Sequence, residues 1–198
     1  MSFGIADLSL IPMRSEKSDR SEMISQILFG EMYQVLEMDE KWVYVRLIHD
    51  GNEGWIDRKM YVPVSDEYVV KYRSESPMLT TEVFNIITKD GDYGNKLIVA
   101  GSVLPFFDAI TKKMMIGEDS YTLVSKIKDV GIDSLRDLII DYALMYYNTP
   151  YLWGGRSPYG IDCSGLVQIV YRMAGIDLPR DAADQVNGGQ DFSFVEEA

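Results

Sequence analysis

The sequence predicts an α+β protein in which two small β-barrels precede a helical segment. Residues 1 to about 130 show the alternating apolar and polar pattern of short strands, broken at Gly, Asp and Pro. From Asp133 onward the apolar spacing becomes helical. The chain has 198 residues, of which 46% are hydrophobic, and this is enough to bury a core. We therefore expect three domains, at residues 1–66, 67–130 and 131–198.

The first barrel is predicted by four or five short strands in the first 65 residues. In residues 42–47, Trp, Tyr and Arg alternate with Val, Val and Leu, the period of a strand with one buried face. Asp50-Gly51 is a hairpin signal, and another strand begins near residues 54–56. Upstream, two more apolar runs are separated at Gly30. Strands of this length and spacing are typical of a small barrel.

The second barrel is predicted by five further strand candidates between residues 67 and 130. They read "EYVVKYR", "EVFNIITKDGDYG", "KLIVAGSVLPFF", "KKMMIG" and "SYTLVSK". The stretch before them, "VPVSDE", is short and polar, which indicates a boundary between two barrels and not one larger barrel.

Two amphipathic helices follow. The first is capped by Asp133 or Ser134 and ends at Pro150; its apolar stripe is formed by Leu135, Leu138, Ile139, Tyr142 and Tyr146. The second begins near Cys163 and is capped by Gly175, with Pro179 preventing its continuation. Its apolar face contains Leu166, Ile169, Val170 and Met173. Cys163 therefore lies at a helix N-terminus, behind a loop rich in glycine and aromatic residues.

This position suits a nucleophilic thiol. The free N–H groups and positive dipole end of a helix N-terminus stabilise a thiolate, and the N–H of Cys163 itself can face a developing oxyanion. Glycines on both sides of Cys163 allow a neighbouring strand or a substrate backbone to approach closely. From this local pattern alone, Cys163 is either a nucleophile or a buried filler residue.

The formal net charge of −12 argues against a nucleic-acid partner, since no basic patch is present. No apolar run is long enough to span a membrane, and no signal-peptide pattern occurs at the start. We expect a cytoplasmic protein, or a periplasmic or extracellular one if a signal has been removed. We expect no metal and no cofactor, because no carboxylate or cysteine cluster has ligand spacing and no phosphate-binding glycine loop is found.

Residues 151–185, "YLWGGRSPYGIDCSGLVQIVYRMAGIDLPRDAADQ", resemble the NlpC-type cell-wall cysteine peptidases, a papain-like family that cleaves peptidoglycan stem peptides. The elements Y-x-W-G-G, D-C-S-G-L-V and L-P-R-D keep the order and spacing of that family. The barrels resemble the bacterial SH3-like domains of its dipeptidyl-peptidase VI type. The resemblance implies a partial papain-like domain at residues 131–198 and hydrolysis between γ-D-Glu and a diamino acid in peptides beginning with L-Ala.

The resemblance also implies site residues. Cys163 would be the nucleophile and Tyr151 would lie near the oxyanion or the substrate carbonyl. Asp162 and Ser164 would help to bind the acidic dipeptide portion, although both could equally serve the helix N-terminus. These roles remain alternatives at this point.

Three further residues complete the implied site. Arg180 and Asp181 would border the same pocket, or else form a surface pair. Glu22 would bind the free amino group of L-Ala, or else be a solvated charge. Asn52 stands where the family's first SH3-like domain usually has a tyrosine, which bears on specificity and not on reaction type. Trp153 could be a core aromatic.

The general base is missing from this pattern. A papain-type peptidase uses a histidine that follows the cysteine, but the chain has one histidine, His49, which reads as a satisfied turn or surface residue. After the L-P-R-D element only one short apolar run, residues 192–195, could supply a strand. We therefore expect a chain truncated before the catalytic histidine, and inactive by itself.

Three functions remain. The first is a peptidase of muropeptides, and the second is a non-catalytic protein whose SH3-like domains bind a cell-wall peptide. The third, an acyltransferase or amidase acting on another amide, is disfavoured by the L-P-R-D element and the barrels. The oligomeric state and the preferred diamino acid are not determined by the sequence.

Overall fold

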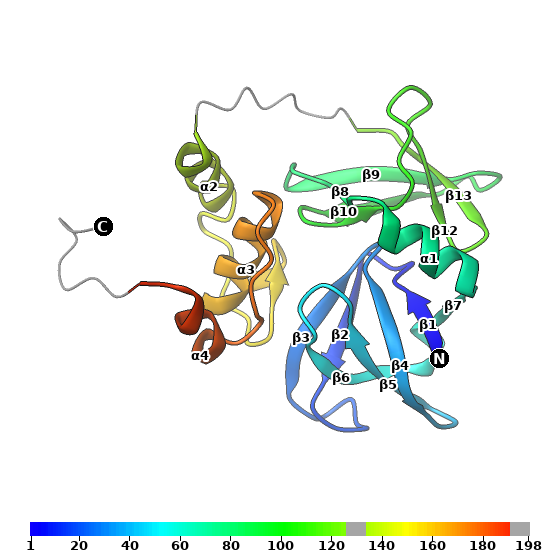
Figure 1. Cartoon of the computed structure of the whole chain (residues 1–198), viewed down its shortest axis with the longest axis horizontal. Coiled ribbons are helices and arrows are strands. Elements are labelled where there is room, and N and C mark those ends of the chain that lie inside the picture. The colour runs from blue at the N-terminus through cyan, green and yellow to red at the C-terminus, as the bar shows by residue number, and fades with distance from the viewer. Residues whose placement is uncertain (126–133, 191–198) are drawn as a thin grey trace.

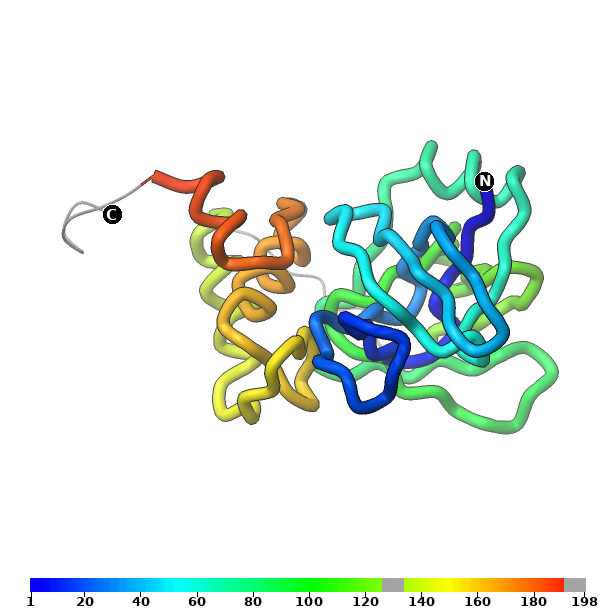
Figure 2. The backbone as a smooth tube through the Cα atoms, turned by 90° about the horizontal axis from the view of Figure 1, so that it is seen from below, coloured from blue at the N-terminus to red at the C-terminus, as the bar shows by residue number. Residues whose placement is uncertain are grey.

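The computed structural model describes residues 1–125 and 134–190. Two antiparallel sheets occupy one side of the molecule and the helices α2 to α4 the other (Figures 1 and 2). The predicted α+β class is confirmed. The domain boundaries stay a prediction, and two expected features, Asp133 as a cap and the run at residues 192–195, lie outside the described residues. No described helix is long and apolar enough to cross a membrane.

The first sheet has seven strands in the order β3-β2-β6-β5-β4-β1-β7, an open series of antiparallel pairs. The strands are β1 (Ser2–Ile5), β2 (Leu10–Arg14), β3 (Met23–Leu28), β4 (Met32–Met38), β5 (Trp42–Leu47), β6 (Glu53–Asp57) and β7 (Val62–Val64), with the 3-10 helix η1 (Arg58–Met60) before β7. Val43, Val45 and Leu47 face the core, whereas the residues between them face outward, as their alternation predicts. The predicted hairpin at Asp50-Gly51 is also confirmed by the pairing of β5 with β6.

The second sheet has four strands in the order β10-β9-β13-β12, next to a small pair formed by β8 and β11. Their bounds are β8 (Met78–Leu79), β9 (Phe84–Lys89), β10 (Asn95–Val99), β11 (Val103–Leu104), β12 (Lys113–Ile116) and β13 (Asp119–Leu123). Four of the five predicted runs coincide with β9 to β13, and β8 lies outside all of them.

The fifth run, "EYVVKYR", is not a strand but belongs to the helix α1 (Asp66–Ser74). Ser65 caps this helix, because its side chain accepts a hydrogen bond from the backbone N–H of Tyr68, and Asp66 and Glu67 occupy the first turn. The paired valines suggested a strand, but only Val69 is buried. The strand prediction was wrong because a capping serine followed by two acidic residues favours a helix start at this position.

The helical part consists of α2 (Leu135–Leu144), α3 (Cys163–Met173), α4 (Ala182–Gln185) and the 3-10 helix η2 (Val186–Gly188). A short hairpin, β14 (Arg156–Ser157) and β15 (Gly160–Ile161), precedes α3. Ser134 caps α2, as one of the two predicted residues, and Gly175 follows α3 with a φ of 88°. One core cluster joins α2 and α3 to Leu28 of the first sheet and Val99 of the second. The helices are therefore packed on both sheets.

Gly30, between β3 and β4, shows how closely the first sheet approaches the β8–β11 pair. Its φ is 76°, and a Cβ at this position would lie 2.0 Å from the carbonyl oxygen of Val103. Gly51 has a similar φ of 72°, but no atom lies within 4 Å of its Cβ position. Only glycine fits at Gly30 without a shift of the backbone.

We predict that Gly30→Ala lowers the free energy of unfolding by about 2–5 kcal/mol. This value is the sum of the cost of a left-handed backbone for alanine and the cost of the clash with Val103. Gly51→Ala is the matched control and should cost about 1–2 kcal/mol, since it has the strain without the clash. Urea unfolding of both variants measures the difference. Equal losses would show that the contact with Val103 can relax freely.

Candidate active site

Cys163 is exposed and is the first residue of α3. The preceding residue, Asp162, caps the helix: its Oδ1 accepts a hydrogen bond of 2.7 Å from the backbone N–H of Gly165. The predicted position of Cys163 at a helix N-terminus is confirmed, and the alternative of a buried filler residue is wrong. The thiol therefore faces solvent beside the free N–H groups of the first helical turn.

A pocket of about 180 Å³ opens at Cys163. It brings together six of the seven predicted site residues, from segments far apart in the sequence: Glu22, Asp162, Cys163, Ser164, Arg180 and Asp181. Tyr151 does not line it; this side chain is 67% exposed. The pocket also has Trp153 and Ile24 in its wall, so it lies between the strand β3 and the start of α3.

Asp162 is at the centre of a buried polar group beneath the cysteine. Arg180 Nη2 donates to Asp162 Oδ2 at 2.6 Å, and Arg180 Nη1 donates to Ser164 Oγ at 2.8 Å. The backbone N–H of Gly154 donates to the same Oδ2. Burial opposes ionisation of Asp162, but the bonds from Arg180 and Gly165 outweigh it and lower the pKa of this carboxyl.

These contacts show which of the alternative structural roles Arg180 and Asp162 have. Arg180 is 4% exposed and pairs with Asp162, so it does not form a surface pair with Asp181. Asp162 acts as helix cap and as partner of Arg180, and its oxygens are bonded within the protein. Both residues fix the loop that ends at the cysteine.

Glu22 and Trp153 form the opposite wall of the pocket. The indole N–H of Trp153 donates to Glu22 Oε1 at 2.5 Å, which connects residues 131 positions apart. Trp153 is 61% exposed, so it is not a core aromatic. Glu22 is exposed to solvent, and its carboxylate lines the pocket beside Trp153.

Gly154 explains how the first sheet can reach the cysteine loop. Its φ is 74°, and a Cβ would lie 2.2 Å from the carbonyl oxygen of Met23 at the start of β3. Gly165 has the same tight approach to the carbonyl of Gly155. These contacts agree with the expectation that the glycines around Cys163 permit close backbone approach.

Comparison with known proteins agrees with this geometry. Residues 148–197 match the model of the NlpC/P60 family, and residues 13–59 match the bacterial dipeptidyl-peptidase SH3 domain. The chain carries an NlpC/P60 domain preceded by a bacterial dipeptidyl-peptidase SH3 domain. The predicted resemblance is therefore confirmed.

Several curated proteins are similar over most of this chain. Dipeptidyl-peptidase 6 of Lysinibacillus sphaericus is 28% identical over 85% of the chain and 68% of its own length. The γ-D-glutamyl-L-lysine dipeptidyl-peptidase of Bacillus subtilis is 27% identical over 84% of the chain and 58% of its own length. The chain thus spans between about half and two thirds of the relatives it matches.

Solved structures show the same fold. An NlpC/P60 family protein from Bacillus cereus superimposes with a TM-score of 0.77 at 20% identity, covering 97% of this chain and 79% of that one. An NlpC/P60 endopeptidase from Photobacterium damselae gives a TM-score of 0.67 over 93% of this chain and 45% of that one.

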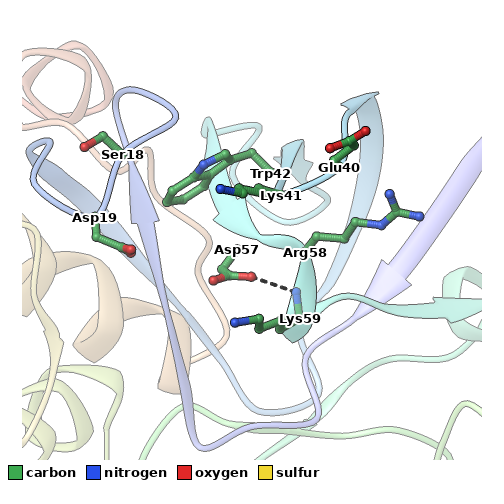
Figure 3. Close-up of a pocket in the computed structure, with 8 residues that line it drawn as sticks. All are labelled: Ser18, Asp19, Glu40, Lys41, Trp42, Asp57, Arg58 and Lys59. Carbon is green, nitrogen blue, oxygen red and sulfur yellow. Dashed lines mark hydrogen bonds between the residues drawn. The ribbon is translucent and has the colours of Figure 1, made fainter.

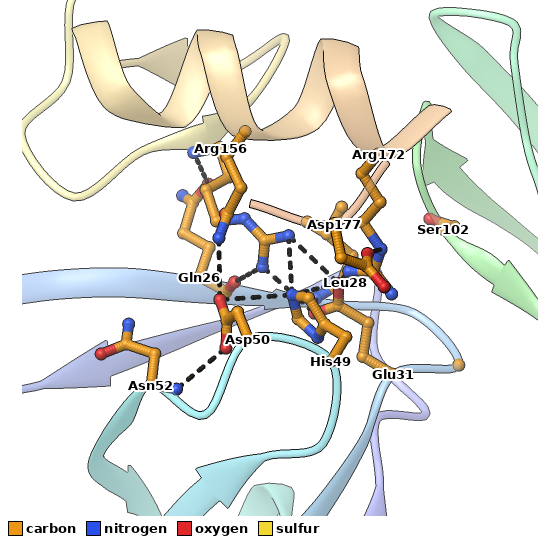
Figure 4. Close-up of polar contacts among 12 residues, drawn as sticks. Gln26, Leu28, Glu31, His49, Asp50, Asn52, Ser102, Arg156, Arg172 and Asp177 are labelled. Atoms are coloured by element: carbon orange, nitrogen blue, oxygen red, sulfur yellow. Dashed lines mark hydrogen bonds and ion pairs between the residues drawn. The ribbon is translucent and has the colours of Figure 1, made fainter. Parts of the chain in front are cut away.

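A buried ionic cluster joins the SH3 domain to the NlpC/P60 domain (Figure 4). Its centre is Glu31, whose side chain has no exposed area. Arg156 Nη2 lies 3.2 Å from Glu31 Oε1, and Arg172 Nη1 contacts the same oxygen. Arg156 also donates to the carbonyl of Gln26 at 2.9 Å, so the hairpin before Cys163 is tied to β3. Burial opposes the charge of Glu31, but the two arginines outweigh it and lower its pKa to about 2.

His49 belongs to this cluster and not to the cysteine pocket. Its Nε2 lies 3.3 Å from both Arg156 Nη2 and Asp50 Oδ2, and the side chain is only 11% exposed. His49 lies in the turn after β5 and has polar partners, as one of the two predicted alternatives has it. Burial, with the charge of Arg172, lowers the pKa of His49 below its usual 6.5. His49 Nε2 thus lies between the Arg156 guanidinium, which can only donate, and the Asp50 carboxylate, which can only accept.

Gln168 connects the centre of α3 to the same place. Its Nε2 donates to Asp50 Oδ2 at 2.9 Å and to the carbonyl of Leu178 at 3.0 Å. The sequence pattern predicted no role for Glu31, Arg156, Gln168 or Arg172.

The one sequence feature that could have indicated a buried ionic cluster was the presence of charged residues inside apolar or glycine-rich stretches. Within the described ranges, no group of three His, Cys, Asp or Glu residues is placed to hold a metal ion.

The lowered pKa of His49 predicts a pH-dependent stability. Unfolded His49 takes up a proton near pH 6.5, whereas the folded residue resists it, so the free energy of unfolding should fall as the pH drops below that value. The slope is at most about 1.4 kcal/mol per pH unit. Glu31 remains ionised throughout this range.

His49→Gln should remove most of this slope between pH 7.5 and 5.5, where the single histidine dominates titration. Urea unfolding at several pH values measures it. An unchanged slope in the variant would show that another group causes the dependence.

Proposed function

We propose that this chain carries the nucleophile and the substrate pocket of a cysteine-type peptidase of cell-wall peptides, one that cleaves between γ-D-Glu and a diamino acid in L-Ala-γ-D-Glu-diamino acid peptides. The observation that carries the proposal is the exposed Cys163 at the start of α3, in a pocket whose other wall holds Glu22. The relatives named dipeptidyl-peptidase 6 and γ-D-glutamyl-L-lysine dipeptidyl-peptidase support it.

The chemistry follows from this position. The thiolate of Cys163 attacks the γ-carbonyl carbon of D-Glu, and the carbonyl electron pair moves to oxygen, where the N–H groups of the first helical turn stabilise it. Collapse of this intermediate breaks the C–N bond and releases the amine of the diamino acid, which needs a proton. Water then hydrolyses the thioester and restores the thiol.

In this proposal, side chains in the pocket walls orient the substrate. The carboxylate of Glu22, beside the indole of Trp153, is placed to bind the free α-amino group of L-Ala. This role gives the SH3 domain a part in selecting peptides with a free amino end. Ser164 and Arg180 hold the loop through Asp162, while Asp181 is exposed at the pocket edge. The proposed place of Tyr151 near the reacting carbonyl stays a prediction.

A second function is favoured by the place of His49. Turnover needs a base that takes the thiol proton and returns it to the leaving amine. The one histidine of this chain is bonded within the cluster of Arg156, Asp50 and Glu31. We therefore propose that the 198-residue polypeptide by itself binds the peptide without turnover, as a non-catalytic binding protein would.

Alkylation of Cys163, the single thiol, tests binding directly. We expect saturating L-Ala-γ-D-Glu-L-Lys to slow modification by iodoacetamide at least about tenfold, because a bound peptide covers the thiol. Glu22→Gln should raise the peptide concentration for half protection at least about fivefold, as an ionic hydrogen bond contributes roughly 1.5–3 kcal/mol. Glu67→Gln, an exposed carboxylate on α1, is the matched control. Mass spectrometry measures both rates.

The same samples test turnover through the release of free lysine. We expect none above the buffer rate. Lysine release that disappears in Cys163→Ser would contradict the assignment of this chain as a binding protein alone. Absence of any protection by the peptide would contradict the assignment of the pocket.

A further inference from the structure

A second and larger pocket lies on the SH3 domain, away from the cysteine (Figure 3). It has a volume of about 560 Å³, within the usual range for small-molecule sites. Three segments form it, residues 18–19, 40–42 and 57–59. None of these residues lines the cysteine pocket. The pocket is therefore a separate feature that the proposed peptidase chemistry leaves unused.

The walls of this pocket are fixed by hydrogen bonds. Asp39 Oδ1 accepts from the backbone N–H of Lys41 and of Trp42, at 2.9 and 2.8 Å. Arg58 donates from Nη1 to the carbonyl of Asp39, and from its backbone N–H to the carbonyl of Lys41. Asp57 Oδ1 accepts from the N–H of Lys59. The pocket is thus formed before any ligand binds, which reduces the entropy lost on binding.

An aromatic surface leads out of the pocket along the outer face of the sheet. Trp42 and Tyr44 lie on the same side of β5, opposite the buried Val43. Trp55 of β6 is the cross-strand partner of Tyr44, with ring centroids 4.8 Å apart. All three rings are half-buried and face away from the core. Such a strip offers flat apolar faces at the edge of a polar hollow.

The polar lining carries as many positive as negative side chains. The basic residues are Lys41, Arg58 and Lys59, and the acidic ones are Asp19, Glu40 and Asp57. Figure 3 shows Asp19 across the hollow from Asp57 and Lys59, with the Trp42 indole above them. In the residues that the structure describes, no ion pair engages the ammonium groups of Lys41 and Lys59. A lining with equal numbers of donors and acceptors of opposite charge suits a neutral ligand with many hydroxyl groups better than an anion or a cation.

We propose that this pocket binds a neutral saccharide of the cell wall, with the indole of Trp42 against a sugar ring and Lys59 and Asp19 bonded to its polar groups. The inference goes beyond the proposed function and does not depend on it, because a peptide with a free L-Ala amino group carries no glycan on that group. The loop at residues 15–22 connects the two sites: Asp19 lines the saccharide pocket and Glu22 the cysteine pocket. A bond of 3.0 Å between Ser15 N and Glu22 O closes this loop.

Titration of the full chain with triacetylchitotriose, followed through the three indole N–H signals by NMR, tests the proposal. We expect a saturable shift of the Trp42 signal at millimolar sugar and no shift of Trp153. Trp42→Ala should raise the dissociation constant at least about tenfold, since loss of aromatic contact and its buried area exceeds about 1.4 kcal/mol. Trp42→Phe, which keeps a ring, should lose less.

Lys59→Met and Asp19→Asn, both at exposed positions, should each weaken the sugar severalfold and so test the site even if Trp42→Ala folds poorly. Glu22→Gln should leave sugar binding unchanged while it weakens peptide protection of Cys163, which separates failure of this inference from failure of the proposed function. A Trp42 signal unmoved by the sugar would overturn the inference. So would a Trp42 signal that responds to L-Ala-γ-D-Glu-L-Lys and not to the sugar.

Discussion

The structure depends on one buried carboxylate, Glu31, and the two arginines that neutralise it. Glu31 follows β3 in the SH3 domain, whereas Arg156 and Arg172 belong to the hairpin and helix that frame Cys163 in the NlpC/P60 domain. Removing one partner of such a pair leaves a buried charge, which typically costs about 3–5 kcal/mol. The cluster therefore ties the two domains together at a buried contact, beside the apolar packing of α2 and α3 on the sheets.

The cysteine pocket is a consequence of this fixed arrangement. One wall is Glu22, at the entrance to β3, and the other is the start of α3. Gly154 lets the cysteine loop press against Met23, and Trp153 then reaches Glu22. His49 is used to complete the cluster and so is not free to serve the thiol. The contacts that build the cysteine pocket therefore come from the same interface that holds the single histidine in the ionic cluster.

Many of the strands and helices and most of the pocket lining could be predicted from the sequence, because they depend on residues that are close together along the chain. Alternating residues predicted β5, and the residues around Cys163 predicted the start of α3 and six lining residues of the pocket. The helix α1 was missed because two valines outweighed the cap at Ser65. The ionic cluster could not be predicted, since its members are more than a hundred positions apart and a charged residue gives no periodic signal.

The most direct test of this account is native-state hydrogen exchange in Glu31→Gln, compared with Glu37→Gln, an exposed carboxylate of the same sheet. If Glu31 holds the domains together, amides of α3 around Leu166 to Val170 and amides of β3 should exchange at least about tenfold faster in Glu31→Gln alone. Equal exchange in the two variants, with both fully folded, would show that apolar packing between α3 and the sheets is sufficient and that the cluster does not position Cys163.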